Sequence, residues 1–283
     1  KGPFMTSVVI TGSRYLIHPE QADRFGPFEK TFLAEGDSWM DASAAVQGSL
    51  PFFLADEFNR RGKTHLIINI STSGQTLQRI SKTMSGDYLW WLKQLSYDAV
   101  LLSAGGNDFI DAARDEAPGE GLLSDMQGQP LPTNGYACVR QDALATLVGD
   151  YLNPNFDAMY QALRASVKNA DTPLLLNCYD TPVARNAPAI AGLVGPWLWT
   201  AYLKNHIHPV LWPSLTAGLF NDIKAAVSGW PTGRTGVQVV PTTGVLAPAS
   251  PDATGSSGDW KNEIHPNVSG WRKQARIWAD LLA

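Results

Sequence analysis

Short apolar segments that alternate with helix-like segments limit this chain to a small number of folds. The predicted strands are 31–34, 65–70, 98–103, 173–177 and 237–240, and they are rich in Leu, Ile and Val. The predicted helices are 42–61, a segment that runs through 90–95, 141–169 and 268–282. Because strands that helices connect run parallel and are covered on both faces, the alternation predicts an α/β fold with a central parallel sheet.

Small polar residues and glycine follow three of the predicted strands. Ser38 follows the first strand in the sequence Gly-Asp-Ser-Trp, Gly74 follows the second, and Asn107 follows the third. In open parallel sheets, ligands bind beyond the carboxyl ends of the strands. Taken singly, each of these residues also suits an ordinary turn or helix cap. Together they predict a site at this edge of the sheet.

One of the five histidines is well placed to act as a base, the role that histidine most often has near neutral pH. His265 lies directly before Pro266 and the predicted last helix, and both restrict its backbone. His206 and His208 could supply two metal ligands, but no third ligand lies nearby at helical spacing. The sequence therefore predicts a catalytic histidine and no metal or other cofactor.

The order of these blocks resembles that of the SGNH, or GDSL-type, serine hydrolase superfamily of esterases and lipases. The matching blocks are 36–39, 73–74, 105–108 and 265–266, and residues 180–198 further resemble a bacterial branch of the superfamily. The resemblance implies a flavodoxin-like fold, a three-layer α/β/α sandwich with a central parallel sheet. It also implies a nucleophilic serine, an oxyanion glycine, an oxyanion asparagine and a catalytic histidine.

The resemblance assigns a role to each candidate residue. Ser38 Oγ would attack an ester carbonyl, and His265 would take the proton of the hydroxyl and later return it to the leaving alcohol. The oxyanion hole would consist of the Ser38 and Gly74 backbone N–H groups and the Asn107 side-chain amide. The expected function is therefore that of a serine esterase that forms an acyl-enzyme.

The third catalytic residue departs from the family pattern. The family usually has Asp three residues before the histidine, where this chain has Asn262. Asn262 could orient His265 through its amide oxygen, Asp259 could curl back to supply a carboxylate, or a backbone carbonyl could leave a Ser-His dyad. Because an amide cannot stabilise an imidazolium as a carboxylate can, we predict Asp259, with Asn262 as the alternative. Glu263 is expected to face solvent.

Composition excludes several classes of protein. The chain has 44% hydrophobic residues and a net charge of −4, which does not suit a disordered chain or a nucleic-acid-binding protein. No apolar run reaches the roughly 20 residues that a membrane helix needs. We therefore predict a soluble protein, cytoplasmic or exported, with an ester substrate and no nucleic-acid partner.

The segment of about 180–230 breaks the alternation and is rich in Pro and Trp. Its tryptophans are Trp197, Trp199, Trp212 and Trp230. They could form an apolar wall beside the pocket, suited to a small-molecule or lipid-like ester, or they could complete the core. Stacking of such rings on sugars makes a carbohydrate O-deacetylase the alternative activity. Asn262 in place of Asp suggests a third possibility, a non-catalytic ligand-binding protein on this scaffold.

The chain is expected to form one domain over residues 5–283, with the segment of about 180–230 as an insertion. Residues 1–4 precede Met5 and resemble an expression remnant. The two cysteines, Cys138 and Cys178, are too few for a disulfide framework, although they could pair.

Overall fold

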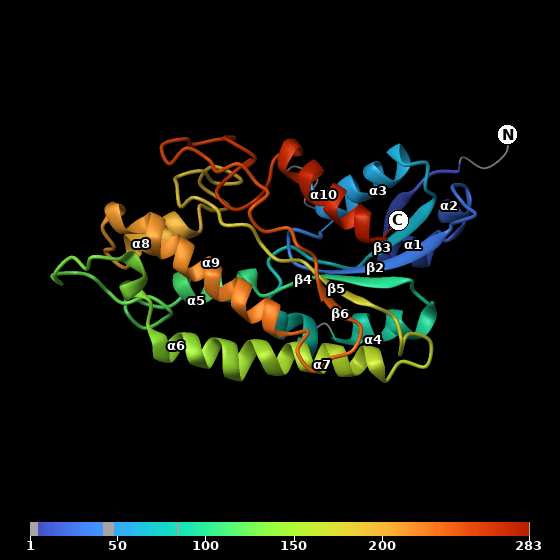
Figure 1. Cartoon of the computed structure of the whole chain (residues 1–283), viewed down its shortest axis with the longest axis horizontal. Helices are drawn as coiled ribbons and strands as arrows, with labels where there is room; N and C mark the ends of the chain where they lie inside the picture. The colour runs from blue at the N-terminus through green and yellow to red at the C-terminus, as the bar shows by residue number, and fades with distance from the viewer. Residues whose placement is uncertain (1–4, 42–47, 84, 283) are drawn as a thin grey trace.

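A parallel sheet of six strands forms the centre of the molecule (Figure 1). The computed structural model describes residues 5–41, 48–83 and 85–282. The strands are β1 (Val8–Thr11), β2 (Lys30–Gly36), β3 (His65–Asn69), β4 (Ala99–Ser103), β5 (Leu174–Leu176) and β6 (Val237–Val239). Their order is β1-β3-β2-β4-β5-β6, and every neighbouring pair is parallel. The predicted α/β fold with a central parallel sheet is confirmed.

Helices cover both faces of the sheet (Figure 1). On one face lie α3 (Leu50–Arg60) and α10 (Val268–Leu282), which pack against each other. On the other face lie α4 (Ser85–Gln94) and the continuous run α6 (Gln141–Thr146), η3 (Leu147–Leu152) and α7 (Asn153–Arg164). This double cover explains why β3 and β4 are buried along their whole length and contain so few polar side chains.

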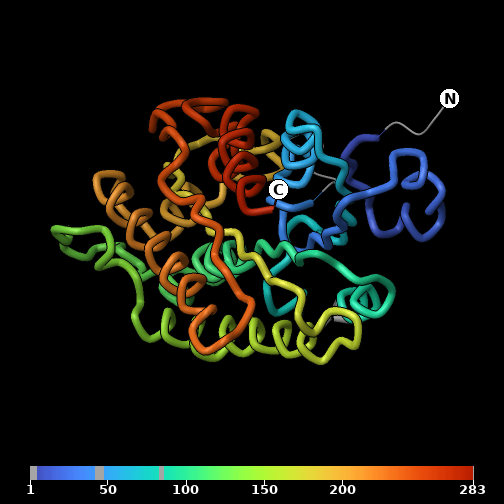
Figure 2. The backbone as a smooth tube through the Cα atoms, turned by 45° about the vertical axis from the view of Figure 1, so that its right-hand side comes forward, coloured from blue at the N-terminus to red at the C-terminus, as the bar shows by residue number. Residues whose placement is uncertain are grey.

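The remaining elements lie at the two ends of the sheet, except for η1 (Arg79–Thr83), which packs against α4 and α7. The elements at the ends are α1 (Gly12–Ile17), α2 (Glu20–Asp23), α5 (Gly106–Arg114), η2 (Gly135–Cys138), α8 (Leu198–Lys204), η4 (Pro209–Leu211) and α9 (Trp212–Gly229). Figure 2 shows α8 and α9 at the opposite end of the molecule from α1 and α2. Both α8 and α9 pack against α5, which begins at the carboxyl end of β4.

Several elements differ from the sequence-based prediction. The helices α1, α2, α5, α8 and α9 were not predicted, and the helix predicted over 141–169 ends at Arg164. Strand β1 was not predicted, because it has only four residues, lies at the edge of the sheet and is only partly buried. The helix predicted over 42–61 begins at Leu50, after Ser49 and with Pro51 in its first turn, and residues 42–47 lie outside the described residues. The last predicted helix, 268–282, agrees with α10.

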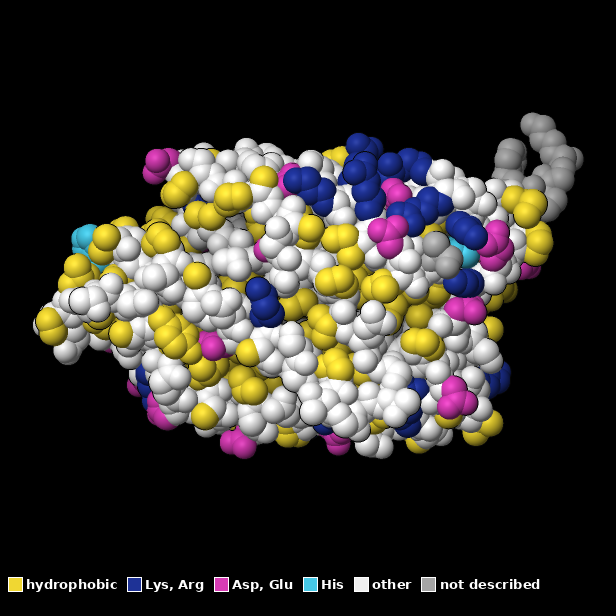
Figure 3. Space-filling view, viewed as in Figure 1, with side chains coloured by type: hydrophobic (Ala, Val, Ile, Leu, Met, Phe, Trp, Pro, Cys, Tyr) yellow, Lys and Arg dark blue, Asp and Glu magenta, His cyan; other side chains and the backbone are white. Residues whose placement is uncertain are grey.

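Apolar packing joins α3 to α10. Trp271 and Trp278 of α10 are fully buried, and the ring of Trp271 lies 6.5 Å from that of Phe53 on α3. Basic side chains gather on the outside of these two helices (Figure 3), where Arg61 pairs with Asp280 at 2.7 Å. Exposed ion pairs of this kind contribute about 0–1 kcal/mol, so the buried rings supply most of the stability.

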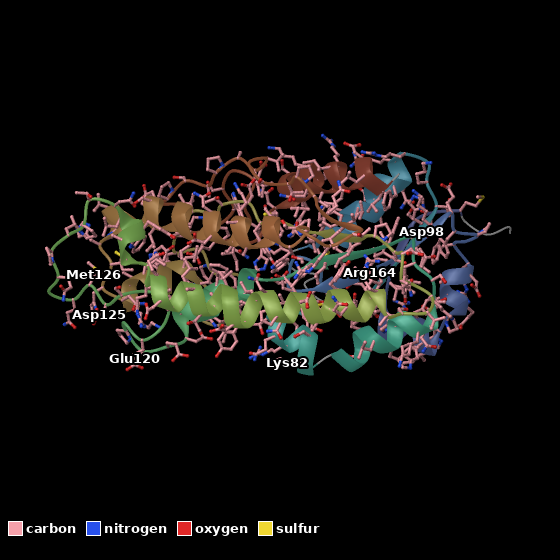
Figure 4. The ribbon with its side chains drawn as sticks, turned by 60° about the horizontal axis from the view of Figure 1, so that its bottom comes forward. Lys82, Asp98, Glu120, Asp125, Met126 and Arg164 are labelled. Atoms are coloured by element: carbon pink, nitrogen blue, oxygen red, sulfur yellow. The ribbon has the colours of Figure 1, made fainter. Side chains whose placement is uncertain are left out.

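Side-chain contacts also join the layer of α4 and α7 to the sheet. Figure 4 brings this layer forward, with Lys82 of η1 and Arg164 of α7 labelled. Arg164 Nη1 donates to the carbonyl oxygen of Thr172 at 3.0 Å, which joins the end of α7 to the segment that leads into β5. None of the described helices has the length and hydropathy that crossing a bilayer requires. Cys138 and Cys178 are both buried and both free thiols.

Gly36 ends β2 in a conformation that other residues rarely adopt, with φ of 141°. A Cβ atom at this position would lie 2.2 Å from the carbonyl oxygen of Ser103. The close approach lets the N–H of Asp37 donate to the same oxygen at 3.0 Å. The turn that follows β2 is therefore fixed against β4.

We expect Gly36→Ala to lower the free energy of unfolding by about 3 kcal/mol or more, because backbone must move to admit the methyl group. Gly62→Ala is the matched control, since Gly62 also has positive φ but no atom lies within 4 Å of its would-be Cβ. It should cost about 1–2 kcal/mol. Urea unfolding measures both, and equal losses would contradict the role of the Gly36–Ser103 contact.

Candidate active site

Ser38 and His265 meet beyond the carboxyl end of β2. Ser38 occupies the turn directly after β2, and His265 lies in the loop that leads into α10. The atoms Ser38 Oγ and His265 Nε2 are 2.8 Å apart, a normal hydrogen-bond distance. The fold thus brings together two predicted site residues that are 227 positions apart in the chain.

Asn262 holds the other ring nitrogen of His265. Its Oδ1 atom lies 3.1 Å from His265 Nδ1 and also accepts the backbone N–H groups of His265, at 2.9 Å, and Ile264, at 3.1 Å. Because this oxygen accepts two backbone donors, the amide orientation is determined. An acceptor at Nδ1 places the ring proton there and leaves the lone pair of Nε2 directed at the Ser38 hydroxyl.

The preference for Asp259 as the third residue does not agree with the structure. The carboxylate of Asp259 accepts hydrogen bonds from Lys273 Nζ at 2.5 Å and from the backbone N–H of Ala247 at 2.6 Å. These bonds hold the pKa of Asp259 below its ordinary value, although its burial opposes the shift. The carboxylate is therefore directed at a cation on α10, and Asn262 takes the position next to His265.

The ring of His265 lies in a dry environment. The side chain is buried, and burial lowers its pKa from 6.5 to about 4, because the charged imidazolium loses its hydration. Among the described residues, no carboxylate hydrogen-bonds to the ring to offset that loss. The imidazole is consequently neutral over most of the pH range and can accept a proton.

Each of the three predicted oxyanion donors has a hydrogen that no described residue accepts. Within the described part of the chain, the backbone N–H groups of Ser38 and Gly74 have no hydrogen-bond partner. Asn107 lines the same cavity as Ser38 and donates one amide hydrogen to the carbonyl oxygen of Gln75 at 2.9 Å, which leaves its second hydrogen for a ligand. Gly74 has φ of 75°, a conformation that suits glycine.

Buried carboxylates fix the loop that carries Gly74. Asp108, in the first turn of α5, accepts the backbone N–H of Leu77 at 2.9 Å, and Asp41 accepts that of Ser73 at 2.7 Å. Together with the bond from Asn107 to Gln75, these contacts hold the loop on both sides of Gly74. Burial raises the pKa of Asp108 to about 6, although the backbone donors oppose that rise.

Asp37 fixes the turn that carries Ser38. Its carboxylate accepts the backbone N–H of Trp39 at 3.0 Å, the hydroxyl of Ser103 at 3.1 Å and the hydroxyl of Tyr179. Burial raises the pKa of Asp37 to about 6 in spite of these donors. Asp37 and Asp108 thus each hold a loop through bonds to its backbone.

Glu263 is fully buried, so the expectation that it faces solvent is wrong. Its carboxylate accepts four backbone N–H groups, those of residues 185, 197, 198 and 199. The last three belong to the start of α8, where the helix dipole also favours a negative charge. Burial raises the pKa of Glu263 to about 7, and the four donors oppose that rise. Glu263 therefore joins the loop of His265 to the segment of about 180–230.

Arg185 reinforces the same junction from the opposite side. Its buried guanidinium donates to the carbonyl oxygens of Asn262 at 2.7 Å, Ala253 at 2.6 Å and Gly255 at 2.5 Å. Arg185 and Glu263 thus hold the segments around Asn262 in place through backbone contacts. Sequence reasoning missed both residues. The one signal for Arg185 was its position in the stretch that resembles a bacterial branch of the superfamily.

The four tryptophans of the 180–230 segment are divided between site and core. Trp197 is half-buried and lies edge-on to His265, with ring centroids 5.4 Å apart. Trp230 is buried and stacks on Phe156, and Trp212 packs on Tyr202. Trp199 is half-buried, and its backbone N–H binds Glu263. Trp197 is therefore the member of this group that contacts a candidate site residue.

Within the described residues, no cluster of three or more His, Cys, Asp and Glu side chains could hold a metal ion. The ring of His206 instead pairs with Asp125 at 2.7 Å on the surface. The side chain of His208 accepts the backbone N–H of Val210.

Comparisons with known proteins agree with this fold. The model of the GDSL-like lipase/acylhydrolase family matches residues 34–273, which is most of the chain, so the chain belongs to this family of hydrolases. No curated protein sequence matches the chain.

Solved structures with a similar fold include enzymes of related description. A possible lipase from Chitinophaga pinensis has a TM-score of 0.54 at 13% identity, with 90% of this chain and 98% of that chain covered. A candidate SGNH hydrolase from Slackia heliotrinireducens has a TM-score of 0.51 at 12% identity, with 90% and 99% covered. A catalytic mutant of an acetylxylan esterase from Geobacillus stearothermophilus has a TM-score of 0.44 at 14% identity, with 89% and 94% covered. At these identities the first two structures show a likeness of fold and nothing further.

We expect Asn262→Asp to raise the pKa of His265 by at least one unit, because a carboxylate beside Nδ1 favours the imidazolium. NMR titration of the ring resonances measures the shift. Asp259→Asn is the matched control: it removes the charge next to Lys273 and should leave the pKa of His265 within about 0.3 units of the wild-type value. The opposite pattern would restore Asp259 as the partner of His265.

We expect Glu263→Gln to lower the free energy of unfolding by about 2–4 kcal/mol, because an amide accepts fewer hydrogen bonds than a carboxylate and turns its NH2 group toward backbone donors. Glu57→Gln is the control, since Glu57 is also buried but binds the partly exposed side chains of Arg60 and Arg61. It should cost about 1 kcal/mol or less. Equal losses of unfolding free energy in urea would contradict a particular contribution of the four backbone hydrogen bonds to Glu263.

Proposed function

We propose that this chain is a serine hydrolase of carboxylic esters that works through an acyl-enzyme on Ser38. The observation that carries the proposal is the 2.8 Å contact between Ser38 Oγ and a buried, neutral imidazole. A serine hydroxyl is a weak nucleophile unless an adjacent base takes its proton. The distance between Ser38 Oγ and His265 Nε2 suits proton transfer.

In the first step, Ser38 Oγ attacks the carbonyl carbon of the ester while its proton moves to Nε2 of His265. The carbonyl π electrons move to oxygen, which becomes an oxyanion. The N–H groups of Ser38 and Gly74 and the free amide hydrogen of Asn107 donate to this oxyanion. Donors that are already in place stabilise the developing charge without reorganisation, and losing one such donor typically costs about 100- to 1,000-fold in rate.

In the second step, the tetrahedral intermediate collapses. The bond to the alkoxide oxygen breaks, His265 gives its proton to that oxygen, and the alcohol leaves the acyl group bound to Ser38. Water then attacks the acyl-enzyme while His265 takes one of its protons, and the same proton returns to Ser38 Oγ as the carboxylic acid departs. Each step needs only the chain, the ester and water.

Asn262 supports this cycle by orientation. Its Oδ1 keeps the proton on Nδ1, so Nε2 stays the acceptor. It does not stabilise the imidazolium as a carboxylate would, and the pKa of His265 of about 4 agrees with that absence of charge. Because the base is active when deprotonated, kcat/KM should stay high down to about pH 4–5 and fall as pH decreases further.

Trp197 supports a carbohydrate O-deacetylase as the second candidate. Its half-buried ring lies edge-on to His265, the residue that would give the leaving alcohol its proton. An aromatic ring in that position could contact a sugar that forms the alcohol part of the ester. The non-catalytic alternative has less support, because a binding protein has no use for a serine paired with a neutral imidazole.

We expect Ser38→Ala to abolish labelling by a fluorophosphonate and to lower kcat/KM for aryl acetates by at least about 10⁴-fold, because the attacking hydroxyl is lost. Ser96→Ala, at an exposed position outside the site, is the control and should keep both. Turnover is measured on a panel of aryl acetates and acetylated sugars, whose ratio separates the two candidates. A wild-type protein that neither reacts with the probe nor hydrolyses any ester would contradict the proposal.

A further inference from the structure

The cavity beside Ser38 is small and mostly apolar. Its volume is about 20 Å³, little more than the space that one or two water molecules occupy. Ser38 and Asn107 belong to its lining. The apolar part of the lining consists of Trp39, Ile110, Tyr179, Pro182, Phe220 and Ile264.

The position of the cavity indicates which part of the ester it would hold. The leaving alcohol must lie near His265, which protonates it, and the ring of His265 is not part of the lining in the described residues. The carbonyl oxygen points to the donors at Ser38 and Asn107. The remaining substituent on the attacked carbon is the alkyl part of the acyl group, which therefore enters the cavity.

We infer that this protein selects esters of short acyl groups, with acetyl as the best fit. The inference rests on the proposed function and narrows its substrate class. A cavity of about 20 Å³ admits a methyl group, whereas each further methylene must displace a packed wall. Lipid-like acyl chains are consequently excluded from this side of the nucleophile.

The rear wall of the cavity is held rigidly. Tyr179 donates its hydroxyl hydrogen to Asp37, and its hydroxyl oxygen lies 3.1 Å from Ser103 Oγ. Its ring packs so closely over Gly106 that a Cβ there would lie 2.8 Å from it. The carboxylate of Asp180 accepts the backbone N–H groups of residues 244 and 246 at 2.9 and 2.8 Å. This wall cannot move aside without breaking buried hydrogen bonds.

Two side chains limit the depth of the cavity without taking part in the chemistry. Phe220 comes from α9 and Ile110 from α5, and their exposed fractions are only 6% and 5%. Each contributes apolar volume and no hydrogen bond. Shortening either one should therefore lengthen the acyl group that fits and leave Ser38, His265 and the oxyanion donors in place.

The test is the acyl-chain profile of kcat/KM on p-nitrophenyl acetate, butyrate and hexanoate. We expect the wild-type protein to prefer acetate over butyrate by at least about 10-fold, since a misfitting methylene costs about 10- to 200-fold. Phe220→Ala and Ile110→Ala should each raise the butyrate-to-acetate ratio by at least about 10-fold. Leu219→Ala is the control: Leu219 is buried on the same helix but does not line the cavity, so the ratio should stay within about twofold to threefold of wild type.

The outcomes separate the two proposals. A wild-type protein that hydrolyses hexanoate as fast as acetate, or variants whose ratio matches that of Leu219→Ala, would overturn the acyl-pocket inference and leave the esterase proposal intact. A folded wild-type protein without activity on any ester would overturn the proposed function itself. Because Phe→Ala in a core costs about 3–5 kcal/mol, Phe220→Leu and Ile110→Val serve as milder variants, for which a smaller shift in the same direction is expected.

Discussion

The buried carboxylate of Glu263 is the interaction on which the geometry of the site depends. His265 lies in a loop without regular secondary structure, so the sheet alone cannot fix its position. Glu263, two residues earlier, binds four backbone N–H groups, three of them at the start of α8. Arg185 binds the carbonyl oxygen of Asn262 in the same region. A buried charge with this many donors keeps one arrangement of the loop, which places His265 within hydrogen-bond distance of Ser38.

The chemistry of the site follows from the burial of His265 without a charged partner beside its ring. A carboxylate beside His265 would hold the imidazolium and raise its pKa, whereas Asn262 fixes only the tautomer. The base in the proposed cycle is therefore weak, because burial lowers the pKa of His265 to about 4. In the proposed cycle the oxyanion donors at Ser38, Gly74 and Asn107 stabilise most of the transition-state charge. Buried Asp37 and Asp108 serve this arrangement indirectly, because each holds one of the two loops that carry those donors.

Periodicity and strand-end residues predict most of the fold and the main members of the candidate site. The carboxyl ends of parallel strands meet at one edge, so Ser38, Gly74 and Asn107 could be expected together. The third residue could not be predicted from chemistry alone, because Lys273 on α10 binds Asp259 and only the folded chain brings them together. Glu263 was misjudged because its partners lie about 65–78 residues away. The edge strand β1 was missed because it has only four residues, three of them only partly buried, and so short a segment shows little pattern.

The central claim is that Ser38 becomes acylated during turnover, and one measurement tests it directly. Wild-type protein that is turning over p-nitrophenyl acetate is quenched in acid, digested and analysed by mass spectrometry. We expect one acetyl group, located on the peptide that contains Ser38 and absent from Ser38→Ala. Hydrolysis of the ester with no acetyl group on Ser38, or with the adduct on another residue, would contradict the account.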